Sequence, residues 1–236
     1  MSPHPVTRRL AAELLGTAVL VAVVIGSGIM ATNLTNDVGL QLLINAVATV
    51  AGLGVLILVL GPISGAHFNP AVTGIALLRR EIGGAEGAGY VGVQIVGAIA
   101  GAALANVMFG LPVFSASVKH RSGGGLWLGE VVATAGLLLV IGTLTRTGRG
   151  HLGPVLVPAW IGAAYFFTAS TSFANPAVTI GRSLSNTFAG IAPRDVPLFI
   201  VFQLIGALVG AGLTEMFYPR HGVVPEPLDL PEAVHE

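Results

Sequence analysis

One six-residue pattern occurs twice in this chain and limits what the chain can fold into. The two copies are Phe68-Asn69-Pro70-Ala71-Val72-Thr73 and Ala174-Asn175-Pro176-Ala177-Val178-Thr179. Each copy predicts the start of a helix, because Asn is a favoured N-cap residue and Pro suits the first helical position. A single copy would indicate an ordinary capped helix, but two copies at matching places in two similar halves indicate a duplicated structural unit.

The composition places this duplication in a lipid bilayer. Apolar residues make up 53% of the chain and charged residues 9%, whereas a soluble domain has about 25% charged residues. The mean hydropathy of +0.84 agrees with an integral membrane protein. The formal net charge is zero, which leaves no basic excess for a nucleic-acid partner, and the absence of cysteine excludes disulfides, thiolate metal sites and cysteine nucleophiles.

Apart from His67, which directly precedes the first copy of the pattern, the histidines offer no ligand set for a metal. They lie in terminal or loop stretches without metal-ligand spacing, at positions His4, His120, His151, His221 and His235. We therefore predict no metal, no cofactor and no enzymatic activity.

Long apolar stretches predict six membrane crossings, since about 20 apolar residues span a bilayer as a helix. The stretches are approximately 10–32, 40–60, 87–109, 126–145, 153–171 and 197–218. The Asn-Pro-Ala segments follow the second and the fifth stretch. A charged residue ends each short segment, at Arg79 and at Arg182, so each is long enough for only about half a crossing at about 1.5 Å per residue. We predict that both segments are re-entrant half-helices.

The two halves align beyond this pattern. Segment 10–17 (LAAELLGT) answers 127–134 (WLGEVVAT), and segment 94–101 (QIVGAIAG) answers 203–210 (QLIGALVG). Each half holds three crossings, an odd number, so the second half enters the membrane from the opposite side. The predicted fold is an all-α membrane protein with six transmembrane helices and two re-entrant half-helices in an inverted 3+3 repeat. We expect a single domain over 1–220, with repeats at about 8–110 and 125–220, and a disordered cytoplasmic tail at 221–236, which is Pro-rich and acidic.

Basic residues predict the orientation, because cytoplasmic loops carry an excess of Arg and Lys. With both termini cytoplasmic in the cell membrane, seven basic residues lie inside and four outside. Those inside are Arg8, Arg9, Arg79, Arg80, Arg146, Arg149 and Arg220, and those outside are Lys119, Arg121, Arg182 and Arg194.

Half-helices that enter from opposite faces bring Asn69 and Asn175 near each other at the midplane, where irregular backbone persists only if it lines a cavity or is buried in protein. The asparagine oxygens are expected to cap the half-helices, leaving the NH₂ groups to donate to a permeant molecule. The positive helix ends are expected to oppose cations and proton relay.

With these features the chain resembles the major intrinsic protein family, the aquaporins and aquaglyceroporins. The resemblance extends from Glu13 to about Tyr218 and depends on the conjunction of segments 12–17 (AELLGT) and 64–73 (SGAHFNPAVT), the two Gln-x-x-Gly-Ala sequences and the second Asn-Pro-Ala. It implies a six-span fold with two half-helices, passive conduction of water or small neutral solutes through each subunit, and a homotetramer.

The chain departs from the family pattern at Val178, where most members have an Arg in the outer constriction. Arg182 lies one helical turn further on and does not match the motif position. Three further constriction positions, carried over from the family by their distance from the two asparagines, are Thr49, Ala163 and Ser172. This set lacks a bulky aromatic, a His and an Arg, so it predicts a wide, mildly polar constriction. It resembles the bacterial branch associated with arsenic resistance, which implies glycerol, water and neutral metalloids such as arsenite as solutes.

Other functions remain open from the sequence. A strict water channel shares the fold, a coupled secondary transporter would use Glu13 or Glu130 as an intramembrane carboxylate, and an adhesive membrane protein would not conduct. The resemblance implies instead that Glu13 and Glu130 brace the re-entrant loops by accepting backbone hydrogen bonds. His67 is a candidate proton-sensitive gate, although an ordering role in the cytoplasmic half of the pore is favoured.

Overall fold

The computed structural model describes residues 4–220, and this part of the chain is built from helices. Their order is α1 (Val6–Leu34), α2 (Val38–Ser64), α3 (Pro70–Leu78), α4 (Gly84–Met108), α5 (Gly124–Arg146), η1 (Gly150–Leu152), α6 (Gly153–Phe167), α7 (Pro176–Ser183), η2 (Pro193–Asp195) and α8 (Val196–Phe217). Within residues 4–220, six helical segments are long and apolar enough to cross a membrane. They correspond to the six predicted stretches, whereas the predicted tail at 221–236 lies outside the described residues.

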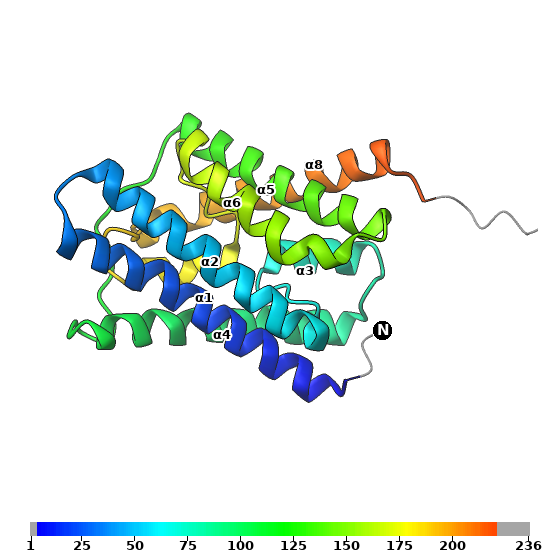
Figure 1. Ribbon diagram of the computed structural model, residues 1–236, viewed down its shortest axis with the longest axis horizontal. Helices are drawn as coiled ribbons and strands as arrows, with labels where there is room; N and C mark the ends of the chain where they lie inside the picture. Colours follow the sequence, from blue (N-terminus) through cyan, green and yellow to red (C-terminus); the bar gives the residue numbers. More distant parts are fainter. Residues whose placement is uncertain (1–3, 221–236) are drawn as a thin grey trace, which may run out of the picture.

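The long helices form a bundle in which α1 begins and α8 ends at the same end (Figure 1). We call this the termini end. The opposite end, called the far end, holds the connections that follow α1, α4 and α7. This arrangement follows from an even number of crossings.

The half-helices α3 and α7 begin where the repeated pattern predicts. Asn69 caps α3 by accepting from the Ala71 backbone N–H, and Asn175 caps α7 by accepting from the N–H groups of Ala177 and Val178. From its capped start, α3 leads back to α4 at the termini end, while α7 leads to α8 at the far end. The two half-helices therefore start inside the bundle and point in opposite directions.

Glycines allow the first and last long helix of each repeat to touch. A Cβ placed on Gly101 of α4 would lie 2.2 Å from the Ala18 carbonyl oxygen of α1, and one on Gly210 of α8 would lie 2.2 Å from the Ala135 carbonyl oxygen of α5. Real Cβ atoms do not approach so closely. Small residues of this kind let membrane helices pack backbone against backbone.

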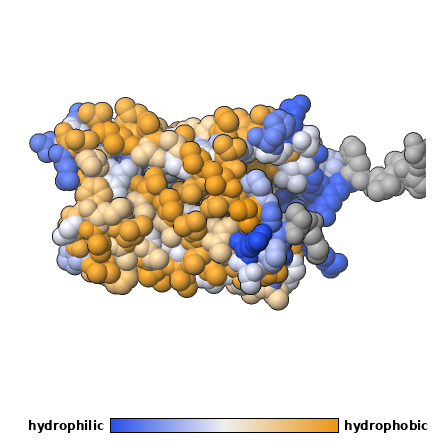
Figure 2. Space-filling view, turned by 60° about the horizontal axis from the view of Figure 1, so that its bottom comes forward, coloured by the Kyte–Doolittle hydropathy of each residue, from blue (hydrophilic) through white to orange (hydrophobic). Residues whose placement is uncertain are grey.

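The outer surface is apolar along the sides of the bundle and polar at its ends (Figure 2). Many large apolar side chains are exposed there, among them Val47, Val55, Leu58, Leu128 and Leu208. A surface of this kind suits the hydrocarbon of a bilayer. The chain is therefore a multi-pass membrane protein.

Candidate functional site

The two re-entrant loops hold each other through their asparagines. Nδ2 of Asn69 donates to the Ala174 carbonyl at 2.8 Å, and Nδ2 of Asn175 donates to the Phe68 carbonyl at 2.8 Å. Each amide oxygen caps its own half-helix. An asparagine amide has two N–H donors, so each has one left for a permeant molecule. The expectation that both NH₂ groups are wholly available was wrong by one donor on each side, because the buried carbonyl of the facing loop also needs a donor.

The loops share an uncommon backbone conformation. In each loop, the residues three before and one before the asparagine have positive φ although they are not glycine. The φ angles are 51° at Ala66 and 48° at Phe68 in the first loop, and 51° at Ser172 and 48° at Ala174 in the second. Such angles are costly for residues with a side chain and persist only where surrounding contacts hold them.

Two buried carboxylates supply those contacts. Glu13 accepts from Ser64 Oγ (2.7 Å), the backbone N–H groups of His67 (2.9 Å) and Phe68 (2.7 Å), and Gln94 Nε2 (2.8 Å). Both oxygens of this carboxylate are thus engaged with the first loop and its neighbour α4.

Glu130 plays the same structural part in the second half. It accepts from the backbone N–H groups of Phe173 and Ala174, both at 2.9 Å, and from Gln203 Nε2 at 2.6 Å. The carboxylates hold the two strained loops in place, and the glutamines join them to neighbouring helices.

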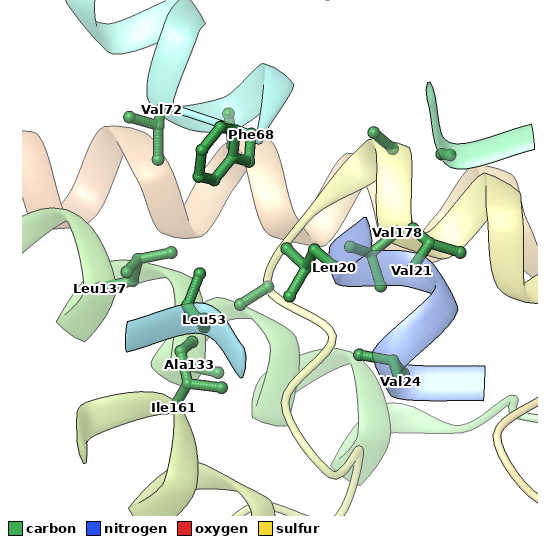
Figure 3. Close-up of a cluster of buried hydrophobic side chains, with 14 of the residues drawn as sticks. Leu20, Val21, Val24, Leu53, Phe68, Val72, Ala133, Leu137, Ile161 and Val178 are labelled. Carbon is green, nitrogen blue, oxygen red and sulfur yellow. The ribbon is translucent and has the colours of Figure 1, made fainter. Parts of the chain in front are cut away.

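A cavity of about 320 Å³ passes between the half-helices. Its lining extends from Arg79 and Glu81 at the termini end, past both asparagines, to Arg182 in the second half. Part of its wall is apolar and comes from both halves of the chain (Figure 3), with Leu20, Val24, Leu53, Phe68, Val72, Leu137, Ile161 and Val178. The rest of the wall carries hydroxyl, imidazole and amide groups, so the cavity offers both apolar and polar surface to a solute.

Three of the four predicted constriction residues line this cavity, namely Thr49, Ser172 and Val178. The fourth, Ala163, does not, because it is exposed on the outer side of α6. Tyr165 lines the cavity instead, and its hydroxyl lies 3.2 Å from Thr49 Oγ1. The prediction of Ala163 was wrong.

The error has a geometric cause. Ala163 was placed by counting twelve residues back from Asn175, whereas the inward-facing residue lies ten residues back. Two residues rotate a helix by about 200°, so the miscount selected the opposite face of α6. The expectation that the constriction lacks a bulky aromatic is therefore also wrong. A tyrosine in an otherwise apolar helix was the available signal, since its hydroxyl needs a partner when buried.

Ser172 and His67 line the cavity on opposite sides of the asparagine pair. The Ser172 hydroxyl is buried and has no hydrogen-bond partner within residues 4–220. The His67 ring contacts Thr73 Oγ1 through Nδ1 at 3.1 Å and packs edge-on against Tyr90 with centroids 5.3 Å apart. These contacts order the His67 ring where it meets the cavity.

Arg182 is a residue whose placement the sequence left undefined. It is 2% exposed and lines the cavity, one turn beyond Val178. Its guanidinium carbon lies 3.4 Å from the centre of the Phe173 ring, and its Nε donates to the Ala189 carbonyl.

Known proteins are similar to this chain in sequence and in fold. A family model described as Major intrinsic protein matches residues 1–174. The aquaglyceroporin AqpS of Rhizobium meliloti is 51% identical over 213 residues, covering 90% of this chain and 91% of AqpS. A glycerol uptake facilitator protein of Pseudomonas aeruginosa is 32% identical, covering 89% of this chain and 88% of that protein. The X-ray structure of the aquaglyceroporin from Plasmodium falciparum matches with a TM-score of 0.66 at 22% identity, covering 92% of this chain and 96% of that one, which confirms the fold. The chain belongs to the major intrinsic protein family.

Proposed function

We propose that the chain forms a passive channel for water, glycerol and neutral hydroxylated metalloids such as arsenite. The observation that carries the proposal is the cavity that runs from Arg79 past Asn69 and Asn175 to Arg182. The relatives named as an aquaglyceroporin and a glycerol uptake facilitator support the same class of solute.

The wall chemistry suits small solutes that are polar on one side. One N–H from each asparagine is available at the midplane, and Thr49, Tyr165 and Ser172 bring hydroxyls to the wall. The apolar part of the wall receives the carbon atoms of a polyol. A cation would have to shed water and then meet two positive helix ends, and charged arsenate would lose its hydration against apolar walls.

Val178 sets the proposed preference for solutes larger than water. An Arg at this place would add bulk, fixed N–H donors and a charge, whereas Val removes all three. The Tyr165 ring occupies part of the space that Val178 leaves free, so the proposed constriction is narrower than the sequence alone predicts. It remains wider than a site that holds both an aromatic ring and an arginine, which disfavours the strict water channel.

The contacts of Glu13 and Glu130 disfavour a coupled transporter. Both oxygens of each carboxylate accept hydrogen bonds from the re-entrant loops and their supporting side chains. Binding a driving ion at either carboxylate would remove acceptors from strained backbone. A purely adhesive protein would have no use for the cavity.

Stopped-flow volume recovery of proteoliposomes under glycerol and water gradients, with arsenite uptake measured in parallel, tests the proposal. Wild-type vesicles should exceed empty vesicles for all three solutes, and Val178→Arg should depress glycerol and arsenite flux far more than water flux. A wild-type rate equal to that of empty vesicles would refute the channel. Equal glycerol flux in wild type and Val178→Arg would refute the part given to Val178.

We further propose a homotetramer of single channel domains, each spanning 1–220, in the cell membrane with both termini cytoplasmic. The bias of seven basic residues against four supports the orientation. Because the chain lacks cysteine, one cysteine added at the C-terminus can report the side. It should react with a membrane-impermeant thiol reagent only after cells are opened, and native mass measurement should give four subunits.

A further inference from the structure

We propose that Arg182 supplies the fixed positive charge of the pore, displaced one turn toward the far end from the place where most family members have their arginine. Width and charge are then set by different residues, Val178 and Arg182. The inference rests on the proposed channel function and adds to it a group that rejects cations and donates to solute oxygens.

Arg182 and Val178 lie on the same half-helix, α7. Val178 and Arg182 are four residues apart, so they lie on the same face of the half-helix, with Arg182 about 6 Å further along the axis. Both line the same cavity. Because α7 leads from the midplane to the far end, a solute that enters from that end meets Arg182 before Val178.

The guanidinium is held rigidly. Its Nε donates to the Ala189 carbonyl, and its carbon lies 3.4 Å from the centre of the Phe173 ring. A cation over an aromatic face is attracted by the ring quadrupole. Arg121 approaches the same ring at 5.0 Å and donates through Nε to the next carbonyl, Gly190, at 2.9 Å. Arg121 does not line the cavity.

The remaining donors of Arg182 are uncommitted. A guanidinium has five N–H donors, and only the one on Nε has a hydrogen-bond partner within residues 4–220. No carboxylate in that part of the chain forms an ion pair with it. An arginine that served only to tie the loop would not need uncommitted donors at the wall of a cavity that the unpartnered Ser172 hydroxyl also lines.

An unpaired charge at a cavity with apolar walls acts over a longer range than in water. It repels cations before they reach the asparagines, although Val178 itself is neutral. Its N–H groups can bind the oxygens of a polyol or of an undissociated metalloid acid, because these solutes carry no opposing charge.

The main test compares Arg182→Gln, Arg182→Lys and the matched control Arg121→Gln in proteoliposomes, with proton leak and glycerol flux measured together. Arg182→Gln should raise the proton leak about tenfold, the effect of losing roughly 1.4 kcal/mol of electrostatic barrier. Arg182→Lys, which keeps the charge, should stay near wild type, and so should Arg121→Gln. An assembled Arg182→Gln channel that carries glycerol without a raised leak would overturn the proposal. So would an equal rise in Arg121→Gln.

A second test leaves Arg182 intact and covers the case in which its variants fail to assemble. Val178→Cys introduces one thiol into a chain without cysteine. A negatively charged thiosulfonate reagent added from the far end should modify this thiol about tenfold faster than a positively charged reagent of similar size, relative to their rates with a free thiol. Equal relative rates would overturn the proposal. If wild-type vesicles carry no glycerol, the channel function fails; if they carry glycerol and the rates are equal, only the role of Arg182 fails.

Discussion

The two re-entrant loops share one backbone and differ in the side chains that they bring to the pore. In both loops an asparagine caps the half-helix, a carboxylate accepts two consecutive backbone N–H groups, and residues at matching positions have positive φ. The fold therefore depends on the asparagine, the carboxylate and the backbone angles, which leaves the other side chains of each loop open to different uses.

The side chain two residues before each asparagine shows this difference. In the first loop it is His67, which packs edge-on against Tyr90 at 5.3 Å; in the second it is Phe173, which packs edge-on against Phe199 at 5.1 Å. The first pair places a polar ring at the cavity. The second pair provides an apolar platform on which Arg182 rests.

The charges around the two loops differ as well. At the termini end arginines meet carboxylates, as in Arg9 with Glu86 at 2.5 Å and Arg79 with Glu215 at 3.5 Å. Behind the second loop, Arg121 and Arg182 donate through Nε to backbone carbonyls. Among the arginines that line the cavity, Arg79 at the termini end has a carboxylate partner, whereas Arg182 has none within residues 4–220. The unpaired positive charge of the pore therefore lies toward the far end, in agreement with a barrier to cations there.

The largest expected effect comes from removing a loop carboxylate, as in Glu13→Gln and Glu130→Gln. The new NH₂ group would face backbone donors, at a cost of about 1–3 kcal/mol for each donor left without an acceptor. Within residues 4–220 Glu13 accepts four hydrogen bonds and Glu130 three, so Glu13→Gln should be the more damaging. Thermal unfolding in detergent measures both, with Glu215→Gln at the exposed ion pair as the control. A loss no larger than that of the control would refute the bracing role.

The next effect tests how far the two halves are equivalent. Gly101→Ala and Gly210→Ala should destabilise the protein by similar amounts, about 1–3 kcal/mol, because each new methyl overpacks a helix contact. In both cases the Cβ would lie 2.2 Å from a backbone carbonyl oxygen. Gly92→Ala and Gly212→Ala are matched controls, since a Cβ at either position meets nothing within 4 Å. The thermal midpoints of the four variants decide the matter, and unequal losses for the first two would show that the halves do not pack alike.

A smaller effect on stability is expected at the residue four positions before each asparagine, where the two loops differ in residue type. Gly65 has φ of +87° and Thr171 has φ of +61°. Gly65→Ala should cost about 1 kcal/mol, since positive φ disfavours a Cβ. Thr171→Gly should be neutral or stabilise by up to about 1 kcal/mol, because relief of this strain offsets the added freedom of the unfolded chain. The same unfolding measurement applies, and marked destabilisation by Thr171→Gly would show that its side chain is needed.

The sequence predicted the features that occur in both halves, and it failed where a residue had to be placed by a single count along the chain. The six spans, the half-helices and the inverted repeat follow from hydrophobic length and from motif positions that both halves share, and the structure confirms them. Tyr165 was missed because its position depends on the length of one loop, for which the other half gives no check. The position of the Arg182 guanidinium depends on its contact with the Phe173 ring and on its hydrogen bond to the Ala189 carbonyl, seven residues away. No local sequence pattern encodes either contact.

The last and smallest effect concerns Lys119, the only lysine in the chain, which extends the charge comparison to the far-end surface. Its Nζ donates to the Phe188 carbonyl at 2.8 Å and lies 4.7 Å from the centre of the Phe188 ring. Partial burial, followed by repulsion from Arg121 and Arg182, lowers the pKa of Lys119 to about 8. The neutral amine, about half of the population at pH 8 against under about 1% for an ordinary lysine, is the form that reacts with acylating reagents.

Because the pKa of Lys119 is lowered on folding, the folded protein holds fewer protons than the unfolded chain above pH 8, and this group favours folding increasingly as the pH rises from there toward its ordinary value. Acylation of Lys119, followed by peptide mass so that the terminal amine is counted separately, should therefore reach half its maximal rate near pH 8. Phe188→Ala, which opens the ammonium to water, should move the midpoint upward, and Lys119→Arg should abolish the modified peptide. A wild-type midpoint near that of a free lysine would mean that neither burial nor the positive field of Arg121 and Arg182 lowers the pKa of Lys119, and the contrast between the two ends would then be confined to the pore itself.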